Sequence, residues 1–339
     1  MSRAGATGTR TGVVLMAHGT PADPDDLERF VTEVRRGRAP DPELLSELAH
    51  RYQRIGGASP LAQRTRWHAD ALARALERER PGQFTVELGY KFAPPRIEEA
   101  VSALARAGIR RAVGVVLAPH YSQMSVGDYA KRAEGAGRES DPPIEVSTVP
   151  QWYLSPGFVP LLAERVRQAV AHLPEEDRAR ATVVFTAHSL PERITEAGDP
   201  YPEQLRESAA VVAAAADVER YAVAWQSAGR SPERWLEPDI SEVIADLGRT
   251  GGSAVVVCPI GFVSEHLEVL YDLDIDAASA AEQAGLLFTR TEMLDGDPRL
   301  ADVLAGVVIA SAGEEAHKAD RAVTQDGSLE PAQNVEGTQ

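Results

Sequence analysis

The chain has 339 residues and is long enough to form two domains, each with its own hydrophobic core. Hydrophobic residues make up 43% of it and charged residues 25%, a composition typical of globular proteins. The formal net charge of −16 argues against general nucleic-acid binding, so an anionic ligand would have to bind at a local basic cluster.

The cysteine content and the length of the apolar segments exclude further classes of protein and of metal site. Cys258 is the only cysteine, so the chain can form no intramolecular disulfide and no zinc or iron–sulfur site built from cysteines alone. No apolar run approaches the about 20 residues of a membrane-spanning helix. We also find no signal peptide and expect a cytoplasmic protein.

The first half of the chain is predicted to alternate strands with helices. Residues 1–11 are expected to be disordered, and a strand at 12–17 follows them. Apolar residues at 27, 30, 31 and 34 have the spacing of an amphipathic helix, a second helix follows Pro42, and a third runs from Pro60 to about residue 80. The remaining predicted elements are strands at 84–90, 112–118 and 144–149 and helices at 94–107 and 125–137.

The second half repeats this alternation. A helix at about 156–172 leads into it, and a last helix runs from about 298 to 311. Residues 313–339 are small and polar and are expected to form a disordered tail. The predicted strands, with helices between them, are 182–187, 221–225, 253–258 and 285–289.

Alternating strands and helices are typical of parallel sheets covered on both faces. We therefore expect an α/β protein with two Rossmann-like domains, residues 12–155 and 156–312, and a cleft between them. Each domain would contain a parallel four-stranded sheet flanked by helices. No Gly-x-Gly-x-x-Gly or Gly-Lys-Ser/Thr motif follows a strand, so nothing indicates a nucleotide site.

Two segments with nearly the same sequence open the two halves. Residues 13–21 read VVLMAHGTP and residues 183–191 read VVFTAHSLP. They match at both valines, the alanine, the histidine and the proline, which indicates a duplicated unit. Each copy places a histidine, His18 or His188, at the tip of its first strand.

Candidate ligands collect where the strands end. In open parallel sheets, ligands bind outside the carboxyl ends of the strands. His18, His120, His188 and the segment 259–268 all fall at such ends. A single histidine of this kind is more often structural, but several that converge on one cleft favour a functional site.

A second candidate site is acidic. Glu268, Asp272 and Asp276 lie at i, i+4 and i+8 of a predicted helix and would share one face. A solvated acidic stripe is one interpretation. Because this helix starts at a strand end, a path for a hydrated divalent cation is the other. Carboxylate with imidazole suits Fe²⁺, Mn²⁺ or Co²⁺.

A third candidate site is basic. Arg35, Arg36 and Arg38 lie close in sequence to Arg51 and Tyr52. These arginines are either a solvated helix end or a site for ligand carboxylates, which the fork of guanidinium donors suits.

Eight motifs follow one another along the chain. They are MAHGTP at 16–21, RRGR at 35–38, GGASPLAQ at 56–63, LAPHYS at 117–122, TAHSLPE at 186–192, GDPYP at 198–202, WQSAG at 225–229 and HLEVLYD at 266–272. In these motifs and their order the chain resembles the ferrochelatases, and among them the coproheme-forming type of Gram-positive bacteria. The resemblance runs from about residue 12 to 310.

The resemblance implies a fold of the class II chelatase type and the insertion of Fe²⁺ into a porphyrin held in the cleft. It implies that His188 and Glu268 are the catalytic and metal-binding pair, with Asp272 and Asp276 as an outer metal site. No cofactor is expected beyond the substrate Fe²⁺, and no [2Fe–2S] cluster. The residues implied to contact the porphyrin are His18, Arg35, Arg51, Tyr52, Ser59 and Tyr129.

His18 departs from the pattern, because the Gram-positive members carry tyrosine at this position. That tyrosine is proposed to approach the metal from the face opposite the catalytic histidine. Histidine also ligates ferrous haem iron. We therefore expect His18 to be an axial ligand of the product iron.

The preferred reaction is Fe²⁺ insertion into coproporphyrin III. The alternatives are a protoporphyrin IX ferrochelatase, a cobalt chelatase acting on sirohydrochlorin, and a porphyrin or haem carrier without catalysis. The arginine cluster favours the four propionates of coproporphyrin. The cobalt enzymes lack the Gly-Gly-x-Ser-Pro and Trp-Gln-Ser motifs. The expected partners are the porphyrin and ferrous iron, with transient contact to a downstream haem-pathway enzyme, and the expected state is a monomer.

Overall fold

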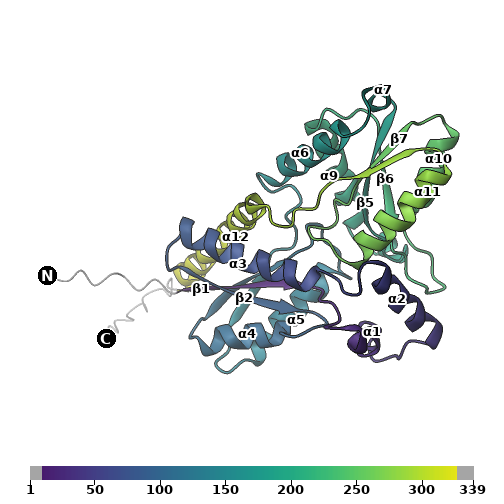
Figure 1. Ribbon diagram of the computed structural model, residues 1–339. Coiled ribbons are helices and arrows are strands. Elements are labelled where there is room, and N and C mark those ends of the chain that lie inside the picture. Colours follow the sequence, from purple (N-terminus) through teal and green to yellow (C-terminus); the bar gives the residue numbers. More distant parts are fainter. Residues whose placement is uncertain (1–9, 327–339) are drawn as a thin grey trace, which may run out of the picture.

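The computed structural model describes residues 10–326 (Figure 1). Most of the N-terminal segment that was expected to be disordered, and residues 327–339 of the expected tail, lie outside the described residues. The structure confirms the predicted α/β class and contains two parallel four-stranded sheets. The predicted strands and the main helices are all present, with ends shifted by a few residues apart from the last helix.

The first sheet has the strand order β2-β1-β3-β4. Its first strand is fully apolar at its centre, and residues 13–16 have no exposed surface. The strands are β1 (Thr11–Ala17), β2 (Phe84–Tyr90), β3 (Arg111–Val116) and β4 (Glu145–Thr148). The helices of this half are η1 (Pro24–Asp26), α1 (Leu27–Val34), α2 (Pro42–Arg54), α3 (Leu61–Glu79), α4 (Ile97–Arg106) and α5 (Val126–Glu139).

The second sheet has the strand order β6-β5-β7-β8. Its strands are β5 (Ala181–His188), β6 (Tyr221–Gln226), β7 (Ala254–Cys258) and β8 (Leu287–Arg290). The helices of this half are α6 (Phe158–Ala171), α7 (Glu175–Arg178), α8 (Arg193–Glu196), α9 (Tyr201–Ala215), α10 (Ile240–Arg249), η2 (Val269–Ala277), α11 (Ala278–Gln283) and α12 (Pro298–Asp326).

The two sheets have the same topology, as the repeated opening sequence predicted. The first strand of each half, β1 or β5, lies between the second and third strands of that half. In both sheets the strand order therefore reverses between the first and third strands of the half, which makes this a topological switch point. Ligands of open α/β sheets bind outside the carboxyl ends of the strands at such a point. His18 directly follows β1, and His188 is the last residue of β5.

The last helix is longer than the sequence indicated. It was predicted to end near residue 311, but α12 continues to Asp326, so residues 313–326 of the expected disordered tail are helical. Alanine, glutamate, lysine and arginine, which favour helix, together make up half of residues 313–326. The small and polar character of the tail as a whole did not indicate this propensity. Although α12 follows the second sheet in sequence, it packs mainly against α3 of the first half (Figure 1).

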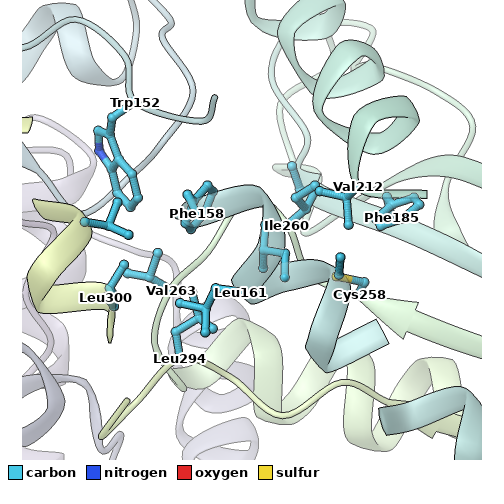
Figure 2. Packing of buried hydrophobic residues seen from close by; sticks show 14 of the residues in the cluster. Trp152, Phe158, Leu161, Phe185, Val212, Cys258, Ile260, Val263, Leu294 and Leu300 are labelled. Carbon is cyan, nitrogen blue, oxygen red and sulfur yellow. The ribbon is translucent and has the colours of Figure 1, made fainter. Parts of the chain in front are cut away.

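One hydrophobic core extends through both halves. It joins Leu15 of β1, Phe185 of β5 and Phe158 of α6, none of which has exposed surface. Figure 2 shows Phe158 with Trp152 and Ile260 of the same cluster. Burial of apolar surface contributes about 25 cal/mol per Å². A core shared in this way favours one fixed arrangement of the two sheets, and it supports the cleft described next.

Candidate active site

A cavity of about 460 Å³ lies between the carboxyl ends of the two sheets. This volume is within the range of cofactor-sized ligands. Glu268 is the only carboxylate among its lining residues in the part of the chain that the structure describes, and most of the wall is apolar. The polar side chains that line it are His18, Thr20, Tyr52, Ser59, Thr65, His120, Ser125, His188, Tyr201, Ser264, His266 and Glu268.

His188 and Glu268 form a pair on one wall. His188 is held by the end of β5, and Glu268 immediately precedes η2. Nδ1 of His188 lies 3.1 Å from Oε2 of Glu268, and each side chain is 34% exposed. His266 adds a second imidazole, whose Nε2 lies 3.6 Å from the same carboxylate oxygen. The Nδ1 of His266 lies 2.9 Å from the carbonyl oxygen of Ser264, which orients this ring.

His188 and Glu268 shift each other's pKa values in opposite directions. Burial lowers the pKa of His188, but the charge and hydrogen bond of Glu268 outweigh it, so the net effect raises the pKa. Burial alone would raise the pKa of Glu268, yet His188 and His266 hold it well below its usual range. Glu268 is therefore ionised, and the proton of the pair resides on the imidazole.

Such a pair can accept a proton and can also ligate a metal. A neutral imidazole is both a base and a ligand, and a carboxylate beside it stabilises the imidazolium that forms. Among residues 10–326, no group of three or more His, Cys, Asp or Glu side chains is placed to hold a metal ion by itself.

His18 belongs to the opposite side of the cavity. Its ring packs against Phe92, at 4.8 Å between centroids, and against the edge of Phe30 at 5.9 Å. Nδ1 lies 3.2 Å from the carbonyl oxygen of Gly19 and donates to it, so Nε2 keeps its lone pair. His18, His188 and Glu268 all line the same cavity, so the two walls face the same space.

The pKa of His18 shifts in the direction opposite to that of His188. Its side chain opens into the cavity, but the surrounding walls remove it from bulk water, and this desolvation lowers its pKa to about 4. The hydrogen bond to Gly19 and the charge of Glu268 oppose this effect without cancelling it. His18 is thus a neutral imidazole at ordinary pH and offers a nitrogen lone pair to a metal.

The acidic helix differs from the α-helix that its spacing indicated. Residues 269–277 form a π-helix, a rare form that is frequent at functional sites. Asp272 does not line the cavity: Ser227 donates to one of its oxygens, and Arg51 lies 3.1 Å from the other. Burial, with the charges of Glu268 and Asp276, raises the pKa of Asp272 to about 6.

The five remaining residues that were predicted to contact a porphyrin fall into two groups. Tyr52 and Ser59 line the cavity, and the hydroxyl of Tyr52 lies 3.3 Å from that of Thr20. Arg35, Arg51 and Tyr129 do not line it. Arg35 follows the end of α1, Arg51 also pairs with Glu47 at 2.8 Å, and the ring of Tyr129 packs under the ammonium of Lys91.

Several side chains of the site were not predicted from the sequence. His266 stands two residues before Glu268, in a motif that was recognised as a whole without a role for each member. Phe30 and Phe92 flank His18, and Phe30 was identified only as an apolar helix position. Ser227 lies in the Trp-Gln-Ser motif and has a left-handed backbone, with φ of 60°. Such a conformation is uncommon for serine and often marks functional sites.

Comparison with known sequences gives one family. The sequence model of the family described as Ferrochelatase matches residues 10–312. A protein of Geobacillus kaustophilus named coproporphyrin III ferrochelatase is 44% identical over 306 residues, covering 90% of this chain and 96% of that protein. A protein of Bacillus subtilis with the same name is also 44% identical over 306 residues, covering 90% of this chain and 98% of its own length.

Comparison with solved structures bears on the fold alone. SirB from Bacillus subtilis with Fe³⁺ has a TM-score of 0.55 and 11% identity, and the match covers 90% of this chain and 98% of SirB. DR2241 from Deinococcus radiodurans, described as similar in structure to chelatases, has a TM-score of 0.51 and 14% identity, with 89% of this chain and 55% of DR2241 covered. The arrangement of two sheets is therefore that of chelatases.

The electrostatics of the pair predict the effect of Glu268→Gln. Because the carboxylate raises the pKa of His188, its loss should lower that pKa, and the imidazole should lose its proton at a lower pH. An NMR titration of the His188 ring measures this. Asp272→Asn is the matched control, since Asp272 is the weakest of the causes acting on His188, and should lower the pKa less. An unchanged or higher pKa in Glu268→Gln would contradict this account of the pair.

Proposed function

Because the chain belongs to the ferrochelatase family, we propose that it inserts ferrous iron into coproporphyrin III and releases iron coproporphyrin III, or coproheme, for haem synthesis. The two relatives at 44% identity are named for this substrate. For the site, the proposal is carried by one arrangement, the His188–Glu268 pair across an apolar cavity from the neutral His18.

The chemistry of insertion matches what His188 and Glu268 offer. Two pyrrole N–H protons must leave for each Fe²⁺ that enters, so the net charge of the macrocycle with its iron does not change. Neutral His188 accepts one of these protons, and Glu268 stabilises the resulting imidazolium through its charge and hydrogen bond. The second proton passes to water. The ionised carboxylate is also a ligand for the arriving iron.

The shape and lining of the cavity suit a flat tetrapyrrole. Apolar side chains make up most of its wall and can pack against both faces of the macrocycle. Tyr52 and Ser59 supply hydroxyl donors for propionates. Arg51 is engaged by Glu47 and Asp272, so we propose that a propionate exchanges with these carboxylates for its guanidinium. Arg35 and Tyr129 are proposed as further contacts at the periphery.

Asp272 and Asp276 are proposed as an outer metal site, which the iron would reach before it reaches Glu268. The charge of Asp276 raises the pKa of Asp272, so the two carboxylates repel each other. The raised pKa of Asp272 supports this role, because a bound cation would relieve the unfavourable burial of its charge. Ser227 and Arg51 hold both oxygens of Asp272, so an arriving cation would compete with Arg51.

The other features of the proposal concern cofactors, partners and location. Within residues 10–326, no helix is long and apolar enough to cross a membrane. We propose that the enzyme needs no resident cofactor and holds no [2Fe–2S] cluster, since the sequence has one cysteine. A monomeric state, a cytoplasmic location and a transient contact with a downstream haem-pathway enzyme are likewise proposals.

Activity with purified components tests the function. The wild-type chain should insert Fe²⁺ into coproporphyrin III faster than into protoporphyrin IX. His188→Ala should lower kcat by about 10²- to 10⁴-fold, the usual contribution of a general base, because the imidazole whose basicity Glu268 raises would be lost. His172→Ala, at the C-terminal end of α6 and outside the cavity, is the control and should keep normal activity. Equal or faster turnover of protoporphyrin IX would contradict the proposed preference for coproporphyrin III. Normal iron insertion by His188→Ala would contradict the catalytic role of His188 and favour the alternative of a porphyrin or haem carrier without catalysis.

His18 is proposed to ligate the iron of the product. Its Nε2 carries a free lone pair, and with a pKa of about 4 it is not protonated at neutral pH. The absorption spectrum of bound iron coproporphyrin III should therefore change in His18→Ala, because an axial ligand is lost. Tyr52→Phe, which alters another residue of the cavity wall, should leave the band positions in place. An unchanged spectrum in His18→Ala would contradict ligation.

A further inference from the structure

Two sequence motifs have no part in the chemistry proposed above, yet they contact each other between the two halves. LAPHYS at 117–122 follows β3 of the first half, and GDPYP at 198–202 leads into α9 of the second half. Asp199 is the centre of this contact and is 8% exposed. One of its oxygens accepts from the hydroxyl of Ser122, at 2.9 Å, and from the backbone N–H of Gln123, at 2.7 Å.

The same carboxylate also holds the start of α9. Its other oxygen accepts from the backbone N–H of Tyr201 at 3.0 Å. One turn further along, the side-chain oxygen of Gln204 accepts from the backbone N–H of Tyr121 at 2.8 Å. Buried hydrogen bonds of this kind are costly to break, because the separated groups would lose their partners without gaining water.

Tyr201 carries the contact to the active site. Its hydroxyl donates to the backbone carbonyl of His188 at 3.0 Å. The ring is 8% exposed and packs against Trp225, with 5.5 Å between centroids, and against the edge of His120. A continuous path of hydrogen bonds thus runs from the first half, through Asp199 and Tyr201, to the backbone that carries the His188 imidazole.

We propose that Asp199 and Tyr201 are positioning residues that fix His188 relative to the first half, and so relative to a macrocycle lying against His18. Other polar contacts also join the halves near the cavity: a buried hydrogen bond of His68 with Ser264, at 3.0 Å, and ion pairs of Arg51 with Asp272 and of Arg230 with Glu47. The two arginines are partly exposed, at 30% and 55%, and exposed ion pairs contribute little in water. The path through Asp199 differs from all of these contacts because it is buried and ends on the backbone of His188.

This inference rests on the proposed iron insertion, and a pair of tyrosine variants tests it. Tyr201→Phe removes the hydroxyl that holds His188 and keeps the ring packing. Tyr153→Phe is the matched control: its ring stacks on the same His120, and its hydroxyl also reaches α9, donating to Glu207 at 2.6 Å, but it does not contact His188. Steady-state Fe²⁺ insertion into coproporphyrin III, thermal unfolding, and the NMR resonance of the His188 ring are measured for both.

Tyr201→Phe should lower kcat about tenfold, since a small misplacement of a reacting group is costly, while the KM for coproporphyrin III changes less than about twofold. It should also shift the His188 resonance. Tyr153→Phe should keep both the kcat and the resonance of the wild type, with a similar thermal midpoint. Equal kcat values in the two variants, a loss confined to KM, or an unmoved His188 resonance in Tyr201→Phe would overturn the inference.

A double-mutant cycle tests Asp199. Asp199→Asn keeps one acceptor oxygen and loses the other, so it should lower kcat in the same way. If both residues act along one path, the double variant Asp199→Asn/Tyr201→Phe should lose less than the product of the two single effects. Independent, multiplicative losses would contradict a shared path. A wild-type chain that inserts no iron would contradict the proposed function, whereas the His188 resonance would still decide the positioning role.

Discussion

The carboxylate of Glu268 is the constraint on which the site depends. It lies 3.1 Å from Nδ1 of His188 and 3.6 Å from Nε2 of His266, and both imidazoles keep it ionised. In return it raises the pKa of His188. Across the cavity, His18 has no carboxylate partner, and desolvation lowers its pKa to about 4. The two histidines occupy the same position of a repeated motif, but their pKa values shift in opposite directions because Glu268 pairs with only one of them.

The different roles of the two histidines require that the two sheets keep a fixed position relative to each other. Each sheet presents a histidine at the tip of its first strand, and the shared core around Phe158 joins the halves behind the cavity. The path through Asp199 and Tyr201 then ties the His188 backbone to the first half. A cavity whose reactive groups come from different halves must fix both in place before a rigid substrate enters.

Much of this could be predicted from the sequence, because the strongest patterns are local. The apolar strands, the helix periodicities and the repeat VVxxAHxxP lie within short windows, and parallel sheets dictate that strand-end residues such as His188 converge. The π-helix could not be predicted, since acidic residues four apart fit an α-helix equally well. The partners of Asp272 could not be predicted either, because Arg51 lies 221 positions away in sequence. The contact of Asp199 with Ser122 could not be predicted either, because these residues are 77 positions apart in sequence.

The central claim is that a tetrapyrrole lies between His18 and the His188–Glu268 pair. A crystal structure of the wild-type protein with iron coproporphyrin III measures this directly. We expect the macrocycle in the cavity between the two sheets, with the iron at bonding distance from Nε2 of His18 and with His188 and Glu268 over the opposite face. A macrocycle bound outside this cavity, or one with both histidines on the same face, would contradict the account.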